Sequence, residues 1–165
     1  MLDERLTLAA DMAAVERPLK ALTQCNPDLQ RRQTVAGVGL LTSTALVAAG
    51  GSPERFPDGQ HLSSWLGLSS PESSSGNRPH LGKITKQGDV YIRTLLVHGA
   101  RAVLTRIKTL QRAGKPLPPL YQWANALAQR VGHNQAAGAL ANTMARICWA
   151  VWTKQTDCNP NHLAA

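Results

Sequence analysis

The sequence is poor in aromatic residues and in the residues that build metal sites. Phe, Trp and Tyr together make up 4% of the 165 residues, so a core must come mainly from Leu, Val and Ala, which favours helices packed closely through small side chains. The three cysteines, Cys25, Cys148 and Cys158, have no C-x-x-C spacing, and the five histidines are scattered. This pattern excludes a disulfide framework and a zinc site, and it is typical of free thiols in a reducing compartment.

Long hydrophobic runs and the usual hydrolase motifs are also absent. The longest apolar run, residues 35–51, is too short and too rich in Gly, Ser and Thr to span a membrane. Asp3 and Glu4 stand where a secretion signal carries positive charge, so the sequence predicts a cytoplasmic protein. It contains no G-x-S-x-G, P-loop or H-E-x-x-H motif, which excludes the enzyme classes built on them.

Acidic residues are scarce after residue 60. Residues 1–60 carry 6 basic and 7 acidic side chains, whereas residues 61–165 carry 12 basic and 3 acidic ones, so the net charge of +8 comes from the second part. Nine of those basic residues lie between Arg78 and Lys115, with Asp89 as the one acid among them. Such a patch is typical of a surface that binds a polyanion, although it can also serve solubility alone. The scattered acids Glu72, Asp89 and Asp157 predict no metal site.

The sequence is organised as helices. Apolar residues recur at helical spacing, Pro and Gly mark the ends, and the one candidate for extended structure is a short piece at residues 80–84. The sequence therefore predicts an all-α, compact helical domain. The predicted helices span residues 2–16, where Pro18 interrupts the first, then 27–33, 60–66, 89–113, 120–131 and 134–154. We divide the chain into a connecting amphipathic helix (1–26), a helical domain (27–156) and a frayed tail (157–165).

The helix predicted over residues 89–113 has the clearest pattern. Asp89 is suited to cap its start and Gly114 to end it. One face is apolar, and on another face four basic residues fall within about 100° of one another: Arg93, Arg101, Lys108 and Arg112. A face exposed only to solvent is the usual explanation for such a pattern, but most solvated helix faces mix charges of both signs, so this face without acids is a candidate surface for a polyanion.

A glycine-rich turn lies earlier in the chain, at residues 37–39. Gly37-Val38-Gly39 joins two apolar helical segments. Gly37 and Gly39 allow a tight reversal and expose backbone N–H groups at the start of the next helix, where an anion is favoured. This pattern is typical of a helix-hairpin-helix element, which holds DNA phosphates without reading bases. A purely structural helix turn gives the same pattern.

Residues 67–88 form a serine-rich basic loop. The turn Ser74-Ser75-Gly76 leads into a segment that holds three basic residues, Arg78, Lys83 and Lys86. A hydroxyl nucleophile needs positive charge nearby to stabilise the anion it generates, so a serine beside basic residues suits chemistry on a phosphodiester. A flexible linker has a similar composition.

These segments occur in an order that resembles one protein family. The stretches AGVGLLTSTALVAAGG, RF, LSSWLGL, SSG and LGKITKQGDVYIRTLLVHGARAVL are followed by W-A-x-x-L-A-x-R at 123–130 and A-R-I-C-W-A at 145–150. This series resembles the C-terminal domain of the IS110 family of insertion-sequence transposases, in its IS1111 subgroup, which is related to the Piv-type DNA invertases. The resemblance covers about residues 30–152 and identifies residues 27–156 as the C-terminal transposase domain.

The resemblance implies a role in DNA transposition and recombination. In the family, a serine just before the glycine of the S-G motif is the nucleophile on DNA. That position is Ser75 here, with Ser74 as the second candidate. Attack on phosphorus would store the energy of the phosphodiester in a serine–DNA linkage. The residues then expected to bind phosphate and stabilise the transition state are Arg78, Lys83, Lys86 and Arg93.

The resemblance also implies partners. Family members pair this domain with an N-terminal RuvC-like domain whose four acidic residues bind a divalent metal, so Mg²⁺ is expected with that domain and no cofactor in this chain itself. The expected partners are DNA, an element-encoded guide RNA and, for a full-length protein, further copies of itself. The expected location is the bacterial cytoplasm, at the nucleoid.

The sequence departs from the family pattern at several positions. In the serine-rich loop, Ser70 and Pro71 replace a usual proline and arginine, and Asn77 replaces a second glycine. Thr143 follows Asn142 where a lysine is usual. Because the acidic domain is also missing, we expect a truncated or split transposase that binds DNA without completing transposition. The alternative is a non-catalytic helical module that binds nucleic acid.

Overall fold

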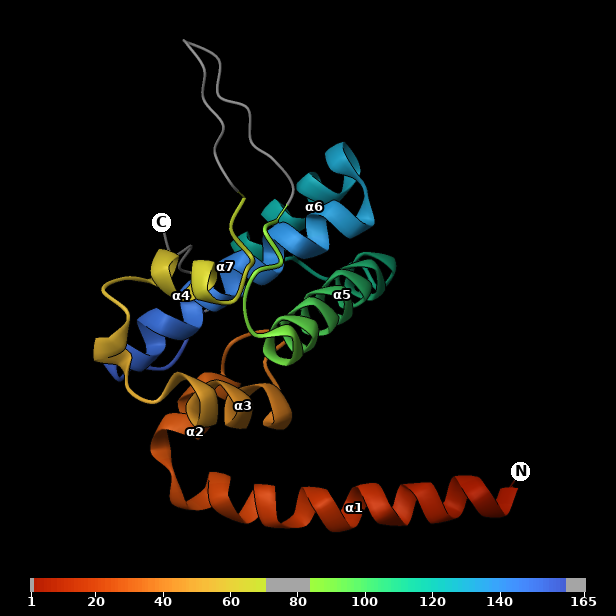
Figure 1. Ribbon diagram of the computed structural model, residues 1–165. Helices are drawn as coiled ribbons and strands as arrows, with labels where there is room; N and C mark the ends of the chain where they lie inside the picture. Colours follow the sequence, from red (N-terminus) through yellow and green to blue (C-terminus); the bar gives the residue numbers. More distant parts are fainter. Residues whose placement is uncertain (1, 71–83, 160–165) are drawn as a thin grey trace.

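The fold comes from a computed structural model that describes residues 2–70 and 84–159, and side chains from residue 4 onward. Within these ranges the chain forms seven α-helices and one short 3-10 helix, with no strand (Figure 1). The all-α prediction is therefore confirmed for the described chain. In chain order the elements are α1 (Leu2–Cys25), α2 (Pro27–Gln33), α3 (Leu40–Gly50), η1 (Pro53–Arg55), α4 (Gly59–Trp65), α5 (Val90–Arg112), α6 (Pro119–Val131) and α7 (His133–Lys154).

Helix α7 lies at the centre of the fold (Figure 1). It contacts α2, α4, α5, α6 and η1. Its buried side includes four alanines, and such small side chains allow neighbouring helix axes to approach closely. Among its buried residues are Ala136, Ala137, Leu140, Ala141 and Met144. The core is thus made largely from Leu, Val and Ala, as the composition predicts.

Most helix boundaries lie where the sequence predicts them. The helices expected over 27–33, 60–66, 89–113, 120–131 and 134–154 are confirmed as α2, α4, α5, α6 and α7, each end within one residue. At the start of α5 the carboxylate of Asp89 accepts the backbone N–H of Ile92 at 2.8 Å. Gly114 follows the end of α5 with φ +63°, a conformation that suits glycine.

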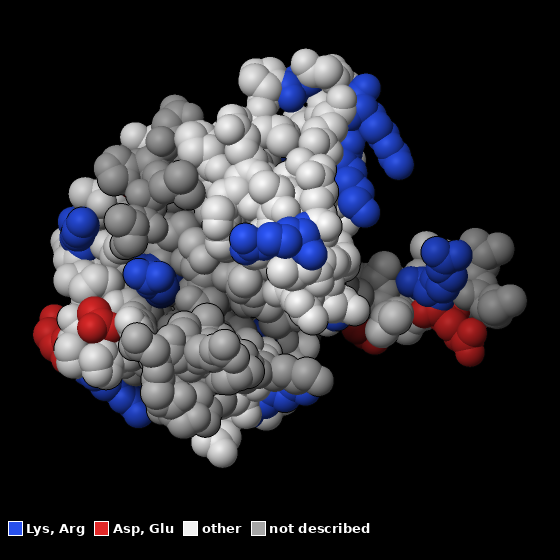
Figure 2. All heavy atoms as spheres, turned by 90° about the horizontal axis from the view of Figure 1, so that it is seen from above, with Lys and Arg blue, Asp and Glu red and all other residues white. Residues whose placement is uncertain are grey.

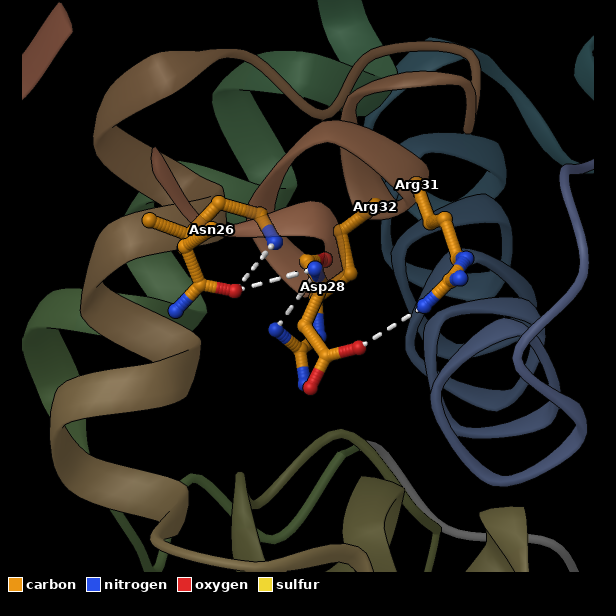
Figure 3. A network of polar contacts seen from close by, with 5 residues as sticks. Asn26, Asp28, Arg31 and Arg32 are labelled. Carbon is orange, nitrogen blue, oxygen red and sulfur yellow. Dashed lines mark hydrogen bonds and ion pairs between the residues drawn. The ribbon is translucent and has the colours of Figure 1, made fainter. Parts of the chain in front are cut away.

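Polar side chains fix the start of α2 (Figure 3). The side-chain oxygen of Asn26 accepts the backbone N–H groups of Asp28 and Leu29, at 2.9 and 3.4 Å. Asp28 pairs with Arg31 at 3.1 Å. The neighbouring Arg32 turns into the core instead, where its Nη1 donates to the backbone carbonyl of Asp28 at 3.3 Å. Successive arginines of α2 therefore have different surroundings.

The first helix differs from its prediction. Pro18 does not interrupt it, because α1 continues through Pro18 to Cys25. The proline removes the N–H that would bond the carbonyl of Ala14, and its ring crowds that carbonyl. Both residues are exposed, so water can satisfy the carbonyl. Helix α1 extends from the body of the molecule (Figure 1) and contacts α2 and α3. Its predicted apolar face stays open: Leu6, for example, is 66% exposed.

The described end of the chain contacts the turn after α2. The backbone N–H of Cys158 donates to Oγ1 of Thr34 at 2.8 Å, and Cys158 packs against the core. Residues 157–159 of the tail predicted to fray are therefore held at this contact, while the rest of that tail lies outside the described residues. The division into residues 1–26, 27–156 and 157–165 stays a prediction.

No helix in the described ranges has the length and hydrophobicity that a membrane span requires.

Candidate nucleic-acid groove

A groove opens where α5, α6 and α7 meet the two ends of the serine-rich loop. Its volume is about 820 Å³, within the range of ligand-binding pockets. Leu68 and Ser70 border it after α4, and Ile84 and Lys86 border it before α5. The helices contribute Arg101 from α5, Trp123 from α6 and, from α7, Asn134, Gln135, Gly138, Ala139, Asn142 and Thr143. This space is hereafter the stem groove.

Two backbone hydrogen bonds hold the borders of the stem groove together. The N–H of Thr85 donates to the carbonyl of Ser69, and the N–H of Lys86 donates to the carbonyl of Gly67, both at 3.0 Å. Gly67 has φ +68°, and a Cβ there would lie 2.7 Å from the carbonyl oxygen of Gln87. This close approach therefore requires glycine. The chain on both sides of residues 71–83 is fixed beside the groove.

One face of α7 forms a wall of the stem groove. The residues of this wall recur at helical spacing and are not among the buried residues of α7. They are Asn134, Gln135, Gly138, Ala139 and Asn142. The amide Nδ2 of Asn142 donates to the carbonyl of Leu68 at 3.0 Å, which ties α7 to the border of the groove. Among the described residues, neither the amide oxygen of Asn142 nor the amide group of Gln135 has a hydrogen-bond partner. These groups can therefore bind a ligand.

Among the described residues, two cations and no acid line the stem groove. Nη2 of Arg101 lies 3.4 Å from Oδ1 of Asn134, a long contact, and the side-chain amine of Lys86 has no partner in the described chain. Figure 2 shows basic side chains at several separate places on the face seen from above, whereas acidic ones gather on the protruding helix and at one edge. Ion pairs occur elsewhere in the described chain, among them Lys20–Glu16 and Arg31–Asp28, and the ring of His61 contacts Asp58. The charges of Lys86 and Arg101 therefore favour an anionic ligand.

The predicted basic face of α5 is divided in the structure. Arg101, Lys108 and Arg112 are exposed. Arg93 is half-buried, and its Nη1 donates to the carbonyl of Leu66 at 3.1 Å. Arg93 therefore ties α5 to the chain after α4, a contact that the helical periodicity did not indicate. Its role in binding DNA stays a prediction, as do those of the other three.

Several predicted site residues lie outside the described residues. They are Ser74, Ser75, Arg78 and Lys83. The nucleophilic role of Ser75, or of Ser74, therefore stays a prediction. Of the predicted binding residues, the structure brings Lys86 and Arg101 together in the stem groove. Within residues 2–70 and 84–159, no group of three or more His, Cys, Asp or Glu side chains could hold a metal ion.

The glycine-rich turn does join two helices, α2 and α3, as predicted. Gly37 has φ +81°, and a Cβ on Gly99 of α5 would lie 2.0 Å from the carbonyl oxygen of Gly37. Packing against α5 therefore explains both of these glycines. Gly39 is exposed at the start of α3, and a Cβ there would meet nothing within 4 Å. The binding of phosphate by Gly37 and Gly39 stays a prediction.

The sequence prediction missed the ligand-facing side of α7 and the side chain of Trp123. Trp123 and Asn142 belong to the segments that carry the family resemblance, but their sequence context does not mark them as groove residues. A signal was available, because Asn134, Gln135 and Asn142 recur on a face of the helix that excludes its apolar residues. The groove itself required the tertiary structure, since its residues come from five separate parts of the chain.

Known proteins resemble this chain over most of its length. Residues 29–115 match the family model described as "Transposase IS116/IS110/IS902 family". A "Probable family 20 transposase" of Pseudomonas aeruginosa is 38% identical over 158 residues, which cover 96% of this chain and 45% of the relative. The "Transposase for insertion sequence element IS1111A" of Coxiella burnetii is 43% identical over 140 residues, covering 85% and 37%. The "Transposase for insertion sequence element IS1328" of Yersinia enterocolitica is 32% identical over 149 residues, covering 90% and 43%.

The chain spans less than half the length of these relatives. The family match nevertheless covers more than half of the chain and includes the glycine-rich turn, both borders of the stem groove and all of α5. The resemblance predicted from the motifs is therefore confirmed. The chain belongs to the IS116/IS110/IS902 family of transposases.

Proposed function

We propose that this chain is the DNA-binding, serine-bearing domain of a transposase and acts in DNA transposition and recombination. The observation that carries this proposal is the stem groove. Ser70 and Ile84, which lie on either side of the predicted nucleophile in the sequence, both line the stem groove. There, the side chains of Lys86 and Arg101 have no carboxylate partner among the described residues. A phosphodiester attracted to that groove would come close to Ser70 and Ile84, the described residues nearest in sequence to the predicted nucleophile.

The proposed chemistry is nucleophilic substitution at phosphorus. The hydroxyl oxygen of Ser75, or of Ser74 as the second candidate, attacks the phosphorus of a DNA strand and forms a P–O bond. The bond from phosphorus to the leaving strand breaks, and that strand departs as a hydroxyl that takes up the serine's proton. The serine–DNA ester keeps the energy needed to reseal a strand. The negative charge of the transition state would be met by Arg78, Lys83, Lys86 and Arg93.

Several partners belong to the same proposal. DNA phosphates outside the reacting position would bind to Arg101, Lys108 and Arg112, and to the backbone N–H groups at Gly37 and Gly39. In the complete enzyme an acidic RuvC-like domain would hold Mg²⁺, which stabilises charge on the reacting oxygens. An element-encoded guide RNA and further copies of the protein are proposed partners as well.

A non-catalytic nucleic-acid-binding module is the second candidate. Ser70, Pro71 and Asn77 replace residues that are usual in the serine-rich loop of the family, and this difference favours loss of the chemistry with retention of binding. Both candidates use the stem groove, so binding alone does not separate them. The formation of a covalent bond does.

A covalent trapping experiment tests the proposal. The full chain is incubated with a nicked suicide-substrate DNA, alone and with an acidic RuvC-like domain added in trans, and protein–DNA adducts are separated on a denaturing gel. We expect an adduct that disappears in Ser75→Ala and persists in Ser69→Ala, a matched serine near the groove. Loss of the adduct in Ser74→Ala instead would assign the nucleophile to Ser74. No adduct under either condition would favour the non-catalytic module.

A further inference from the structure

We propose that the stem groove binds one unpaired nucleotide, with its base against Trp123 and α7. This inference rests on the proposed function, because it takes a nucleic acid as the partner of this chain. It adds that the groove accepts a base that is not paired within a double helix. Four features of the described residues support it.

The first feature is a glycine that packing does not require. Gly138 lies inside α7, where glycine lowers helix stability relative to alanine. A Cβ at this position would meet nothing within 4 Å. The same residue lines the stem groove. Gly99 inside α5 is the opposite case, since a Cβ there would collide with the carbonyl oxygen of Gly37. The space beside Gly138 is therefore available to a ligand that approaches the helix backbone closely.

The second feature is an exposed aromatic ring at the same groove. Trp123 lines it from α6 and is 38% exposed, in a chain with few aromatic residues. A nucleobase stacks on an indole only if one of its faces is free. In a double helix both faces of a base are covered by its neighbours, whereas an extruded or single-stranded base has a free face. Trp123 therefore selects an unpaired base over a duplex.

The third feature is the set of carboxamides on α7. Asn134, Gln135 and Asn142 line the groove, and the amide of Gln135 and the amide oxygen of Asn142 have no partner among the described residues. An unpaired base exposes the donors and acceptors of its pairing edge, and carboxamides offer both kinds of group. These side chains can replace the hydrogen bonds that the base loses when it leaves a pair.

The fourth feature is the charge at the groove. Lys86 and Arg101 line it without a carboxylate partner in the described chain, so they suit the phosphates on either side of an extruded nucleotide. An acidic peptide would also meet these cations, but it has no flat base for Trp123 or pairing edge for the carboxamides. The combination of ring, carboxamides and cations therefore fits a nucleotide.

The test compares affinities of the full chain for three fluorescent DNA duplexes of identical length. One is fully paired, one carries a single extra nucleotide as a bulge, and one carries the same bulge without its base. We expect about tenfold tighter binding of the bulge with a base than of the bulge without one. The ratio of these two affinities is the readout, so a general loss of binding cannot imitate the effect. The same three affinities measured with RNA duplexes show whether DNA or RNA supplies the nucleotide.

Variants locate the preference in the groove. Trp123→Leu removes the aromatic ring and should bring the ratio close to one, whereas Trp123→Phe should keep most of it. Tyr91→Leu, which removes an exposed aromatic residue outside the groove, should leave the ratio unchanged. Gly138→Ala should raise the melting temperature and yet lower the ratio, because its methyl group fills the space that the base uses.

Three results would overturn the inference: a ratio of one in the parent protein for both DNA and RNA, an unchanged ratio in Trp123→Leu, or an unchanged ratio in Gly138→Ala. The outcome is separable from that of the proposed function. A base-dependent ratio without any Ser75-dependent adduct would support the nucleotide groove and leave only the non-catalytic module. An adduct together with a ratio of one would support the serine chemistry and remove the groove from it.

Discussion

The guanidinium carbon of Arg32 lies 4.1 Å from the ring centre of Trp152, and this contact joins α2 to α7 inside the core. Arg32 is 1% exposed, and its Nε and Nη2 have no hydrogen-bond partner among the described residues. Loss of solvent lowers the pKa of Arg32, and nearby Cys148 and Asp28 oppose that shift. A buried cation with unpaired donors lowers stability, and attraction to the ring offsets only part of this effect.

This arrangement predicts that the volume of Arg32 matters more than its charge. Arg32→Met should be at least as stable as the parent, because methionine fills much of the same space without a buried charge. Arg32→Ala should lose about 2–4 kcal/mol, because it leaves a cavity beside Trp152. Urea unfolding followed by circular dichroism measures both. Equal losses in the two variants would show that the cation itself stabilises the core.

The contact between Gly99 and Gly37 predicts a second effect on stability. Gly99→Ala should lose about 1–3 kcal/mol, because the new methyl group would press on the backbone carbonyl of Gly37, which no rotamer change can relieve. Gly138→Ala is the matched control, with the same substitution inside a helix and open space around it, and should gain about 0.5–1 kcal/mol. Similar values for the two variants would contradict the close approach of the α2–α3 turn to α5.

The buried thiol of Cys148 predicts a loss of stability at alkaline pH. Burial raises the pKa of Cys148 to about 12, and Arg32 nearby opposes this rise. In the unfolded chain a thiol has a pKa of about 8.5, so above that value the unfolded state releases a proton that the folded state keeps. The contribution to stability is therefore fully present below pH ~8.5 and falls by up to about 1.4 kcal/mol per pH unit as the pH rises toward 12.

Urea unfolding at pH 8 and pH 10 measures this slope. Other groups titrate in the same range, so the parent is compared with Cys148→Val, which keeps a small apolar side chain without a thiol. We expect a shallower decline with pH in Cys148→Val, and no change of slope in Cys25→Ala, because Cys25 is exposed. The same decline in Cys148→Val and in the parent would mean that this thiol does not set the alkaline limit.

Local signals in the sequence predicted the helices well, because local interactions fix their ends. Asp89 caps α5 and Gly114 follows it, as their side chains and φ preferences indicate. Pro18 was misjudged because a proline ends a helix only where the freed carbonyl cannot find another partner, and α1 is exposed to water there. Local rules therefore predicted the capped ends of helices, whereas the effect of Pro18 depends on its surroundings in the folded chain.

The candidate site was predicted less completely, since it depends on contacts between distant residues. Helical periodicity placed Arg93 and Arg101 on one face, but the carbonyl of Leu66, which binds Arg93, belongs to another part of the chain. The hydrogen bond from Asn142 to Leu68 likewise joins residues far apart in sequence. Residue type and spacing could identify the basic face, whereas the stem groove exists only after α5, α6 and α7 pack around its two borders.

The different surroundings of Arg93 and Arg101 lead to a prediction about binding to duplex DNA. Arg101 is exposed and has no carboxylate partner in the described chain, so Arg101→Gln should reduce the slope of log K against log salt by about 0.9, the loss of one phosphate contact. Lys20→Gln is the control, because Lys20 pairs with Glu16 on α1 and should leave the slope unchanged. Fluorescence anisotropy with a labelled DNA duplex measures both slopes. The salt concentration is varied from about 50 to about 200 mM, over which such slopes are resolved.

Arg93→Gln should act mainly on stability. It removes the hydrogen bond to the carbonyl of Leu66, which is worth about 1.5–3 kcal/mol for a charged donor, and should lower the urea midpoint. Arg101→Gln should leave the urea midpoint close to that of the parent, because its contact to Asn134 is long and exposed. If Arg93→Gln lowers the salt slope as much as Arg101→Gln at unchanged stability, then Arg93 contacts a phosphate, and Arg93, Arg101, Lys108 and Arg112 form one DNA-binding face of α5, as the periodicity of the sequence predicts.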